Sequence, residues 1–270
     1  MMFVFFTFSC AEELVFEESI EVYGHAYGSP RNITKGIYAP LKRHIHGIRE
    51  NKVFLFNGDF VIENDSIHVS NLLNDIDSLR SQATFIRANH EFIHDNKTLE
   101  ELISNRNTHF MFGLASVYLW ESYENKWNLT VKQIEVIEED DSDLIIIICP
   151  EVFWWKFIEK EKAAGNIDLT VYSRQYNSDD NKCDSSNFIN KVLPVLKLKK
   201  AVILISGDAG ALPYVNPYYL LKYNNNITAI NSGMGLNYED NYVELNKLKS
   251  GIVKVYLRDL ESKEIIEELN

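Results

Sequence analysis

Two apolar runs that each end in a small residue and then polar side chains constrain the fold most. In "VFLFNGDFVI" the apolar run gives way to Gly58 and Asp59. About thirty residues later, "TFIRANHEF" repeats this order, with Ala88 ahead of Asn89 and His90. Short apolar runs bounded in this way predict buried strands with polar side chains at their ends.

Two further runs follow the same plan. "ESIEVYGH" ends in His25, and "AVILISGD" ends in Asp208. In α/β sheets, ligands gather outside the carboxyl ends of the strands, and glycine there allows a close backbone approach. Carboxylate, amide oxygen and imidazole suit Mn, Fe or Zn better than Ca. The pattern predicts a site for one or two divalent metal ions, built from His25, Asp59, Asn89 and Asp208.

The order of the remaining patterns predicts an α/β fold. "SIHVSNLLNDIDSLR" repeats apolar residues at helical spacing, and "NLTVKQIEVIEED" predicts a helix that begins after Asn128 or Thr130. "HFMFGLASVYLWES" predicts a hairpin that turns near Gly113, and "DLIIIICPE" a strand buried on both faces. The last third predicts a meander of four strands, "ITAINSG", "NYVELNKL", "GIVKVYLRDLES" and "KEIIEEL". We therefore expect two sheets that face each other, with helices outside.

Composition excludes several classes of function. The 270 residues carry a net charge of −12, which argues against nucleic acid as a partner because phosphate backbones attract Lys and Arg. The sequence has no Gly-x-Ser-x-Gly motif and no P-loop, which argues against a serine hydrolase or an NTPase. A hydrophobic fraction of 46% provides for a sizeable core.

The N-terminal stretch "MMFVFFTFSC" is apolar up to Ser9-Cys10 and is followed by the polar "AEEL". This pattern resembles a bacterial lipoprotein signal, in which Cys10 would be lipidated and would tether the protein to a membrane. The alternative is a first core strand over residues 3–8. We expect residues 1–17 to form the signal and tether and residues 18–270 the folded domain. The signal predicts a cell-envelope location, and the alternative leaves a cytoplasmic one open.

"VFLFNGDFV" followed by "FIRANHEF" resembles the signature of the calcineurin-like metallophosphoesterases, which is Gly-Asp and then Gly-Asn-His-Glu/Asp at strand ends. The resemblance continues through "VILISGDAGALPY" and "NITAINSGMG" and spans about residues 18–269. It implies a four-layer α/β/β/α sandwich of two facing mixed sheets with outer helices. It also implies hydrolysis of a phosphate mono- or diester, of a small molecule or a glycan, by a metal-activated water.

Carried over residue by residue, the resemblance assigns roles to four side chains. Asp59 corresponds to the carboxylate that bridges two metal ions, and Asn89 to a ligand of the second ion. His25 corresponds to a ligand of the first ion. His90 corresponds to the residue that stabilises the transition state or protonates the leaving group, so His90 and Asp59 are the expected catalytic residues.

The sequence departs from the family pattern at several positions. Tyr23 stands where the family's first motif has Asp, and Ala88 replaces a Gly. The middle strand, which should end in a ligand His, offers Glu151, and the last Gly-His-x-His is Gly-Asp208-Ala-Gly210. Two interpretations follow. The metal centre is rebuilt from a divergent ligand set that includes Glu151, or the fold is retained as a catalytically inactive binding protein of the cell envelope.

Three other features favour structural roles over a site. His44 and His46, in "KRHIHG", are two residues apart and predict a surface patch. Trp154 and the tyrosines of "NPYYLLKY" suit packing better than stacking on a ligand. Cys149 ends an apolar run and is expected in the core, since the three cysteines lack metal-site spacing.

Overall fold

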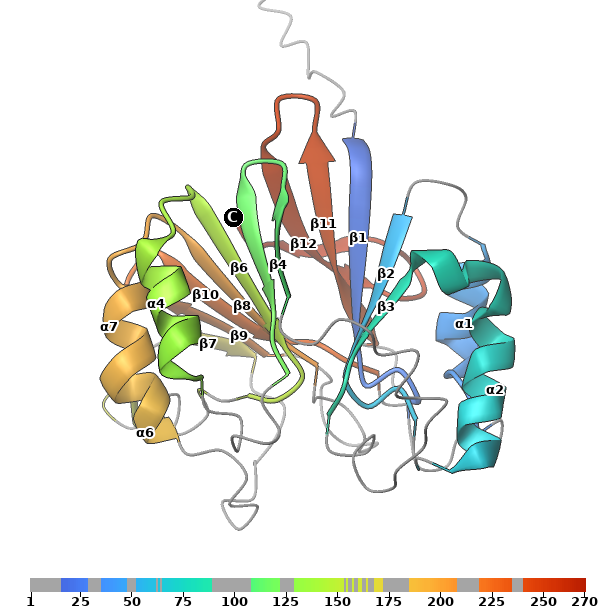
Figure 1. Ribbon diagram of the computed structural model, residues 1–270. Coiled ribbons are helices and arrows are strands. Elements are labelled where there is room, and N and C mark those ends of the chain that lie inside the picture. Colours follow the sequence, from blue (N-terminus) through green and yellow to red (C-terminus); the bar gives the residue numbers. More distant parts are fainter. Residues whose placement is uncertain are drawn as a thin grey trace, which may run out of the picture.

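The computed structural model describes most of the chain. The described residues are 16–28, 35–47, 52–61, 63, 65–88, 108–121, 129–152, 154, 157, 160–161, 164, 168–171, 185–207, 219–234 and 240–270. Two facing sheets form the centre of the molecule, and helices cover their outer faces (Figure 1). None of the helices in these ranges is long and apolar enough to cross a membrane.

The first sheet has six strands in the order β13-β12-β11-β1-β2-β3. Three of these strands run parallel and alternate with helices along the chain: β1 (Phe16–Gly24), β2 (Lys52–Asn57) and β3 (Ala83–Ile86). The other three form an antiparallel meander beside β1: β11 (Asn241–Leu248), β12 (Val253–Asp259) and β13 (Ile265–Glu268). The sheet is therefore mixed.

The second sheet has seven strands in the order β4-β5-β6-β8-β10-β9-β7. Its parallel centre is β5 (Ala115–Leu119), β6 (Leu144–Cys149), β8 (Val202–Ser206) and β10 (Ile227–Asn231). Its antiparallel members are β4 (Thr108–Phe112), β9 (Tyr219–Tyr223) and β7 (Asp168–Val171). The strand β6, apolar at every position, is buried throughout its length, as the sequence predicts.

Helices close the sandwich on both sides. The first sheet is covered by α1 (Ala39–His46), α2 (Ser66–Ile76) and a 3₁₀ helix (Asp77–Gln82). The second is covered by α4 (Val131–Glu139) and by a continuous helical stretch of α6 (Ser185–Asn187), a π-helical turn (Phe188–Val192) and α7 (Leu193–Leu196). Thr130 and Gln133 form a reciprocal capping box at the start of α4.

Apolar side chains fill three layers. The layer between the two sheets contains Val22, Leu55, Ile146, Ile205 and Val243, among others. A second layer lies under α1 and α2, and a third lies under α4, α6 and α7. Successive strand residues point to opposite faces, so each central strand supplies side chains to two layers. The predicted four-layer sandwich of two mixed sheets is confirmed.

Three details differ from the sequence prediction. The sequence predicts that β10 opens the C-terminal meander, but this strand lies in the other sheet, parallel to β8. The strands β7 and β9 were not predicted. The sequence of β9 alternates poorly because Leu220 and Leu221 are both buried, and such a short apolar run does not reveal its sheet.

Candidate functional site

The carboxyl ends of the parallel strands lie level with one another. In the first sheet, Gly24 is the Cα partner of Asn57, and Asn57 is the partner of Ile86. In the second sheet, Ser206 is the partner of both Cys149 and Asn231. Every loop that follows one of these strands therefore begins at the same end of the sandwich.

The two sheets touch at this end through backbone atoms. A Cβ atom added to Gly24 would lie 2.3 Å from the carbonyl oxygen of Ser232 and 2.5 Å from Cα of Gly207. One added to Gly207 would lie 1.9 Å from the carbonyl oxygen of Asn57. The side chain of Asn57 also joins the sheets, because its Nδ2 donates to the carbonyl oxygen of Cys149 at 3.0 Å. The two glycines are therefore required by a contact between strands.

His25 and Asp59 follow directly from this junction and come together. Nε2 of His25 lies 3.5 Å from Oδ2 of Asp59, and both side chains are buried. Both residues have positive φ, 53° and 49° respectively, a conformation that non-glycine residues rarely adopt. Such strain persists where the surroundings over-determine it, and it clusters at functional sites.

Backbone hydrogen bonds fix the two loops that carry these side chains. The N–H of Tyr27 donates to the carbonyl oxygen of Asp59 at 3.2 Å, and the N–H of Gly28 donates to that of His25 at 2.8 Å. The ring of His25 packs against Tyr27, with centroids 4.3 Å apart. The first bond joins the β1 and β2 loops directly, so the His25–Asp59 contact is held by the backbone.

Glu151, the third predicted ligand within the described residues, is buried two residues beyond the end of β6. Its carbonyl oxygen accepts a hydrogen bond from Sγ of Cys149 at 3.2 Å. Among the described residues, the ligand atoms of Glu151, His25 and Asp59 do not all lie within 4.8 Å of one another. Three further predicted site residues, Asn89, His90 and Asp208, lie outside the described residues and remain predictions.

Tyr23, which stands where the family motif has Asp, turns toward the helix layer. It is buried among Phe54, Phe56 and Tyr242, and its hydroxyl donates to Oε2 of Glu21. Burial, and then the neighbouring carboxylate, raise the pKa of Tyr23 well above its usual value, so the hydroxyl stays protonated. Tyr23 therefore replaces the carboxylate of the motif with a protonated hydroxyl and offers a metal ion no ionised oxygen.

The expectation of a surface patch at His44 is wrong. His44 belongs to α1 and is buried on the face of that helix that packs on the first sheet, where its Nε2 lies 3.1 Å from Oε2 of Glu21. It shares the buried face of its helix with Leu41 and Ile45. The spacing of three residues from Leu41 is the signal that could have indicated this burial. Trp154 and Cys149 are buried, as predicted.

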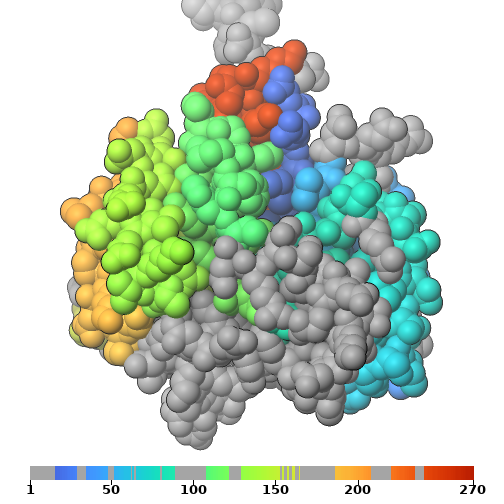
Figure 2. Space-filling model, in the orientation of Figure 1, coloured from blue at the N-terminus to red at the C-terminus, as the bar shows by residue number. Residues whose placement is uncertain are grey.

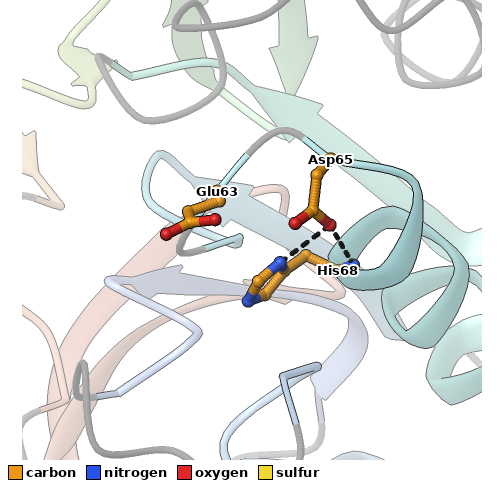
Figure 3. A group of neighbouring side chains, drawn as sticks. All are labelled: Glu63, Asp65 and His68. Atoms are coloured by element: carbon orange, nitrogen blue, oxygen red, sulfur yellow. Dashed lines mark hydrogen bonds and ion pairs between the residues drawn. The ribbon is translucent and has the colours of Figure 1, made fainter.

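Glu63, Asp65 and His68 form a second group of polar side chains, at the start of α2 (Figure 3). Each offers one ligand atom, and the three atoms lie within 4.8 Å of one another. Oδ1 of Asp65 caps the helix: it accepts from the N–H groups of Ile67 and His68 and lies 2.9 Å from Nδ1 of His68. The backbone N–H of His68, foremost, lowers the pKa of Asp65. Helix capping therefore accounts for the positions of Asp65 and His68 without a metal.

Replacement of Asp65 by Ala is expected to lower the free energy of unfolding by about 1 kcal/mol, because two N–H groups of α2 lose their acceptor. Asp65→Asn, which keeps a capping oxygen, is expected to change it by only a few tenths of a kcal/mol. Urea denaturation monitored by circular dichroism measures both. An equal loss in the two variants would contradict a capping role.

Comparisons with known proteins agree with this architecture. No protein-family model matches the sequence, and no curated protein matches it. Among solved structures, the purple acid phosphatase PPD1 from yellow lupin (Lupinus luteus) is similar with a TM-score of 0.58 and 10% identity. The match covers 93% of this chain and 53% of PPD1, so the chain spans about half the length of that protein.

Two further structures match with lower scores. The E. coli phosphoesterase YfcE has a TM-score of 0.41 and 10% identity, over 93% of this chain and all of YfcE (100%). The 5′-nucleotidase from Candida albicans has the same score and identity, over 93% of this chain and 54% of the nucleotidase. The sandwich and the superposition on PPD1 lead to one conclusion: this chain has the fold of the calcineurin-like metallophosphoesterases.

Proposed function

We propose that this protein is a metal-dependent phosphoesterase that hydrolyses a phosphate mono- or diester at the junction of its two sheets. The observation that supports this most is the buried His25–Asp59 contact at 3.5 Å, placed at the carboxyl ends of the strands of a metallophosphoesterase fold. The substrate would be a small molecule or a glycan that carries the phosphoester.

The side chains of His25 and Asp59 fit a divalent metal. Imidazole nitrogen and carboxylate oxygen bind Zn at about 2.0–2.2 Å, so donors 3.5 Å apart can share one ion without rearrangement. The same pair suits Mn and Fe. When bound, such an ion supplies charge that polarises a phosphate and lowers the pKa of a water.

The chain's own residues would divide the remaining work. His25 and Asp59 would hold the ion, and their buried setting would strengthen each electrostatic contact with the substrate. Asn89 is proposed as a further ligand, and His90 as the residue that gives a proton to the leaving group, on the strength of the motif resemblance. Asp208 and Glu151 stand where the motif has His, and they are proposed as substitute ligands of a rebuilt metal centre.

One observation favours a second candidate, a binding protein on the same fold without catalysis. Tyr23 occupies the position of a metal-binding Asp, and its hydroxyl is committed to Glu21 on the helix side of the sheet. The first of two metal positions therefore lacks a ligand that the family motif provides. A protein of this kind would bind a phosphorylated ligand and not turn it over.

Asp59→Asn tests the proposal. We expect it to weaken the affinity for Mn²⁺ or Zn²⁺ by at least about 100-fold, since even changes to residues behind metal ligands cost 10- to 100-fold. Isothermal titration calorimetry of the apoprotein measures the affinity, and hydrolysis of an aryl phosphate measures turnover, which is expected to fall to background.

Asp65→Asn is the matched control, because it removes a carboxylate from the group at the start of α2 and keeps the cap. It is expected to leave affinity and turnover unchanged. Loss of metal in Asp65→Asn and not in Asp59→Asn would move the metal site to α2 and contradict the proposal. A wild type that neither binds metal nor hydrolyses the aryl phosphate would favour the binding protein instead.

A further inference from the structure

Large apolar side chains are exposed at the end of the sandwich opposite the candidate site. Four of them, Phe16, Met111, Leu114 and Ile252, come from three segments far apart in the sequence. Leu114 is 56% exposed and Ile252 is 48% exposed, although both lie in tight turns, which usually carry polar residues. We name these four residues the apolar end.

A hydrogen bond and a strand pairing join the three segments. The N–H of Leu114, in the β4–β5 turn, donates to the carbonyl oxygen of Gly251, in the β11–β12 turn, at 2.8 Å. Phe16, the first residue of β1, is the Cα partner of Leu248 at the end of β11. Figure 2 shows the β1, β4–β5 and β11–β12 surfaces adjoining at the top of the molecule. Apolar residues exposed singly are common, but several gathered at one end mark an interaction surface.

The sequence before β1 indicates what the apolar end binds. The apolar run of residues 3–8 and the lipidation pattern at Cys10 precede Phe16 by a few residues. Cys10 is six residues from Phe16, a distance of at most about 21 Å in a fully extended chain. A chain attached to a bilayer at Cys10 would therefore keep Phe16, at the apolar end, within about 21 Å of the lipid.

We propose that the apolar end docks on a lipid bilayer and that the candidate site faces away from it. Neutral lipids suit this surface better than anionic ones, because the protein carries a net charge of −12 and Glu17 and Glu18 stand beside Phe16. Lys247 pairs with Glu18 at 3.0 Å and lies 3.8 Å from Glu17. The exposed Lys249 of the β11–β12 turn is the second cation, so the two lysines balance the two carboxylates and no excess of positive charge remains there. Apolar insertion, and not attraction to anionic headgroups, would drive the docking.

This orientation limits which substrates can reach the candidate site. This limit rests on the proposed phosphoesterase function. β1 runs for nine residues from the apolar end to Gly24, which precedes His25. At about 3.3 Å per residue, the site would lie about 26 Å from the membrane-facing end. The phosphoester would then belong to a soluble molecule or to a glycan that extends from the surface, and not to a lipid headgroup of the same leaflet.

The docking is tested on the full-length chain with phosphatidylcholine vesicles, by flotation. The double variant Leu114→Ser/Ile252→Ser is expected to lower the partition coefficient at least about tenfold, since each buried apolar side chain contributes substantially to transfer into lipid. The matched control is Ile67→Ser/Val131→Ser, two side chains 55% and 62% exposed at the first turns of α2 and α4, on the opposite end.

Equal loss in both double variants, or no loss in either, would overturn the proposal. Hydrogen exchange supplies an independent measurement: vesicles should slow exchange in the β4–β5 and β11–β12 turns and not in α2. Slowed exchange that needs no vesicles and grows with protein concentration would assign the apolar end to a second copy of the chain. Neither measurement uses metal or substrate, so a failure here is distinct from a failure of the phosphoesterase proposal.

Discussion

Gly207→Ala is expected to lower the free energy of unfolding by at least about 3 kcal/mol. The new Cβ would lie 1.9 Å from the carbonyl oxygen of Asn57 and 3.0 Å from Cα of Gly24. Both obstacles are backbone atoms, so no side-chain rotation relieves the clash and the sheets must separate. Overpacking of this kind typically costs about 1–3 kcal/mol, and a backbone clash lies at or above the upper end.

Urea denaturation monitored by circular dichroism gives the loss directly. Gly47→Ala is the control, because Gly47 ends α1 with a φ of −85° and its added Cβ would come no nearer than 3.3 Å to another atom. Its free energy of unfolding should stay within about 1 kcal/mol of the wild type. A Gly207→Ala protein as stable as the Gly47→Ala protein would mean that the sheets do not touch at Gly24 and Gly207.

The layers of this fold could be predicted because their signals are local. "LIIIIC" in β6 is apolar at every position, so burial on both faces follows from the sequence, and the capping box at Thr130 sets the start of α4. The assignment of strands to sheets is not local. β10 pairs with β8 and not with β11, and nothing in its five residues distinguishes the two partners.

The site could be predicted in part because some of its signals are local too. His25 and Asp59 follow strand ends, and parallel strands that end level with each other bring such residues together. The role of Tyr23 could not be predicted, because it depends on Glu21, two residues earlier on the same strand, being buried. Glu21 lies between two apolar residues of β1, a pattern typical of a solvent-facing position, yet α1 covers it and supplies His44.

The second large loss of stability is expected on replacing the buried carboxylate of Glu21. This carboxylate accepts hydrogen bonds from Tyr23 and Lys52, its Oε2 lies 3.1 Å from Nε2 of His44, and Lys52 also reaches Oε1 of Glu244 at 3.0 Å. Glu21→Gln is expected to lower the free energy of unfolding by about 3 kcal/mol at neutral pH. This is the lower end of the range for a broken buried pair, because Lys52 keeps Glu244.

The pH dependence should change as well. Burial alone would raise the pKa of Glu21, but the hydrogen bond with His44 and the charge of Lys52 outweigh it and lower the pKa below 4.5. A carboxyl whose pKa is lower in the folded state stabilises the fold above its unfolded value and loses that contribution as the pH falls. The wild type should therefore lose stability as the pH falls below 4.5, and Glu21→Gln should lose less over the same interval.

Urea denaturation at about pH 7 and at about pH 3.5 measures both effects. Glu267→Gln is the matched control, because its pair with Lys222 at 2.7 Å lies on the surface and is expected to contribute at most about 1 kcal/mol. The two variants make the same chemical change, so their difference reports burial. Similar losses in both, or an unchanged acid dependence in Glu21→Gln, would mean that the charge of Glu21 does not stabilise the helix side of the first sheet.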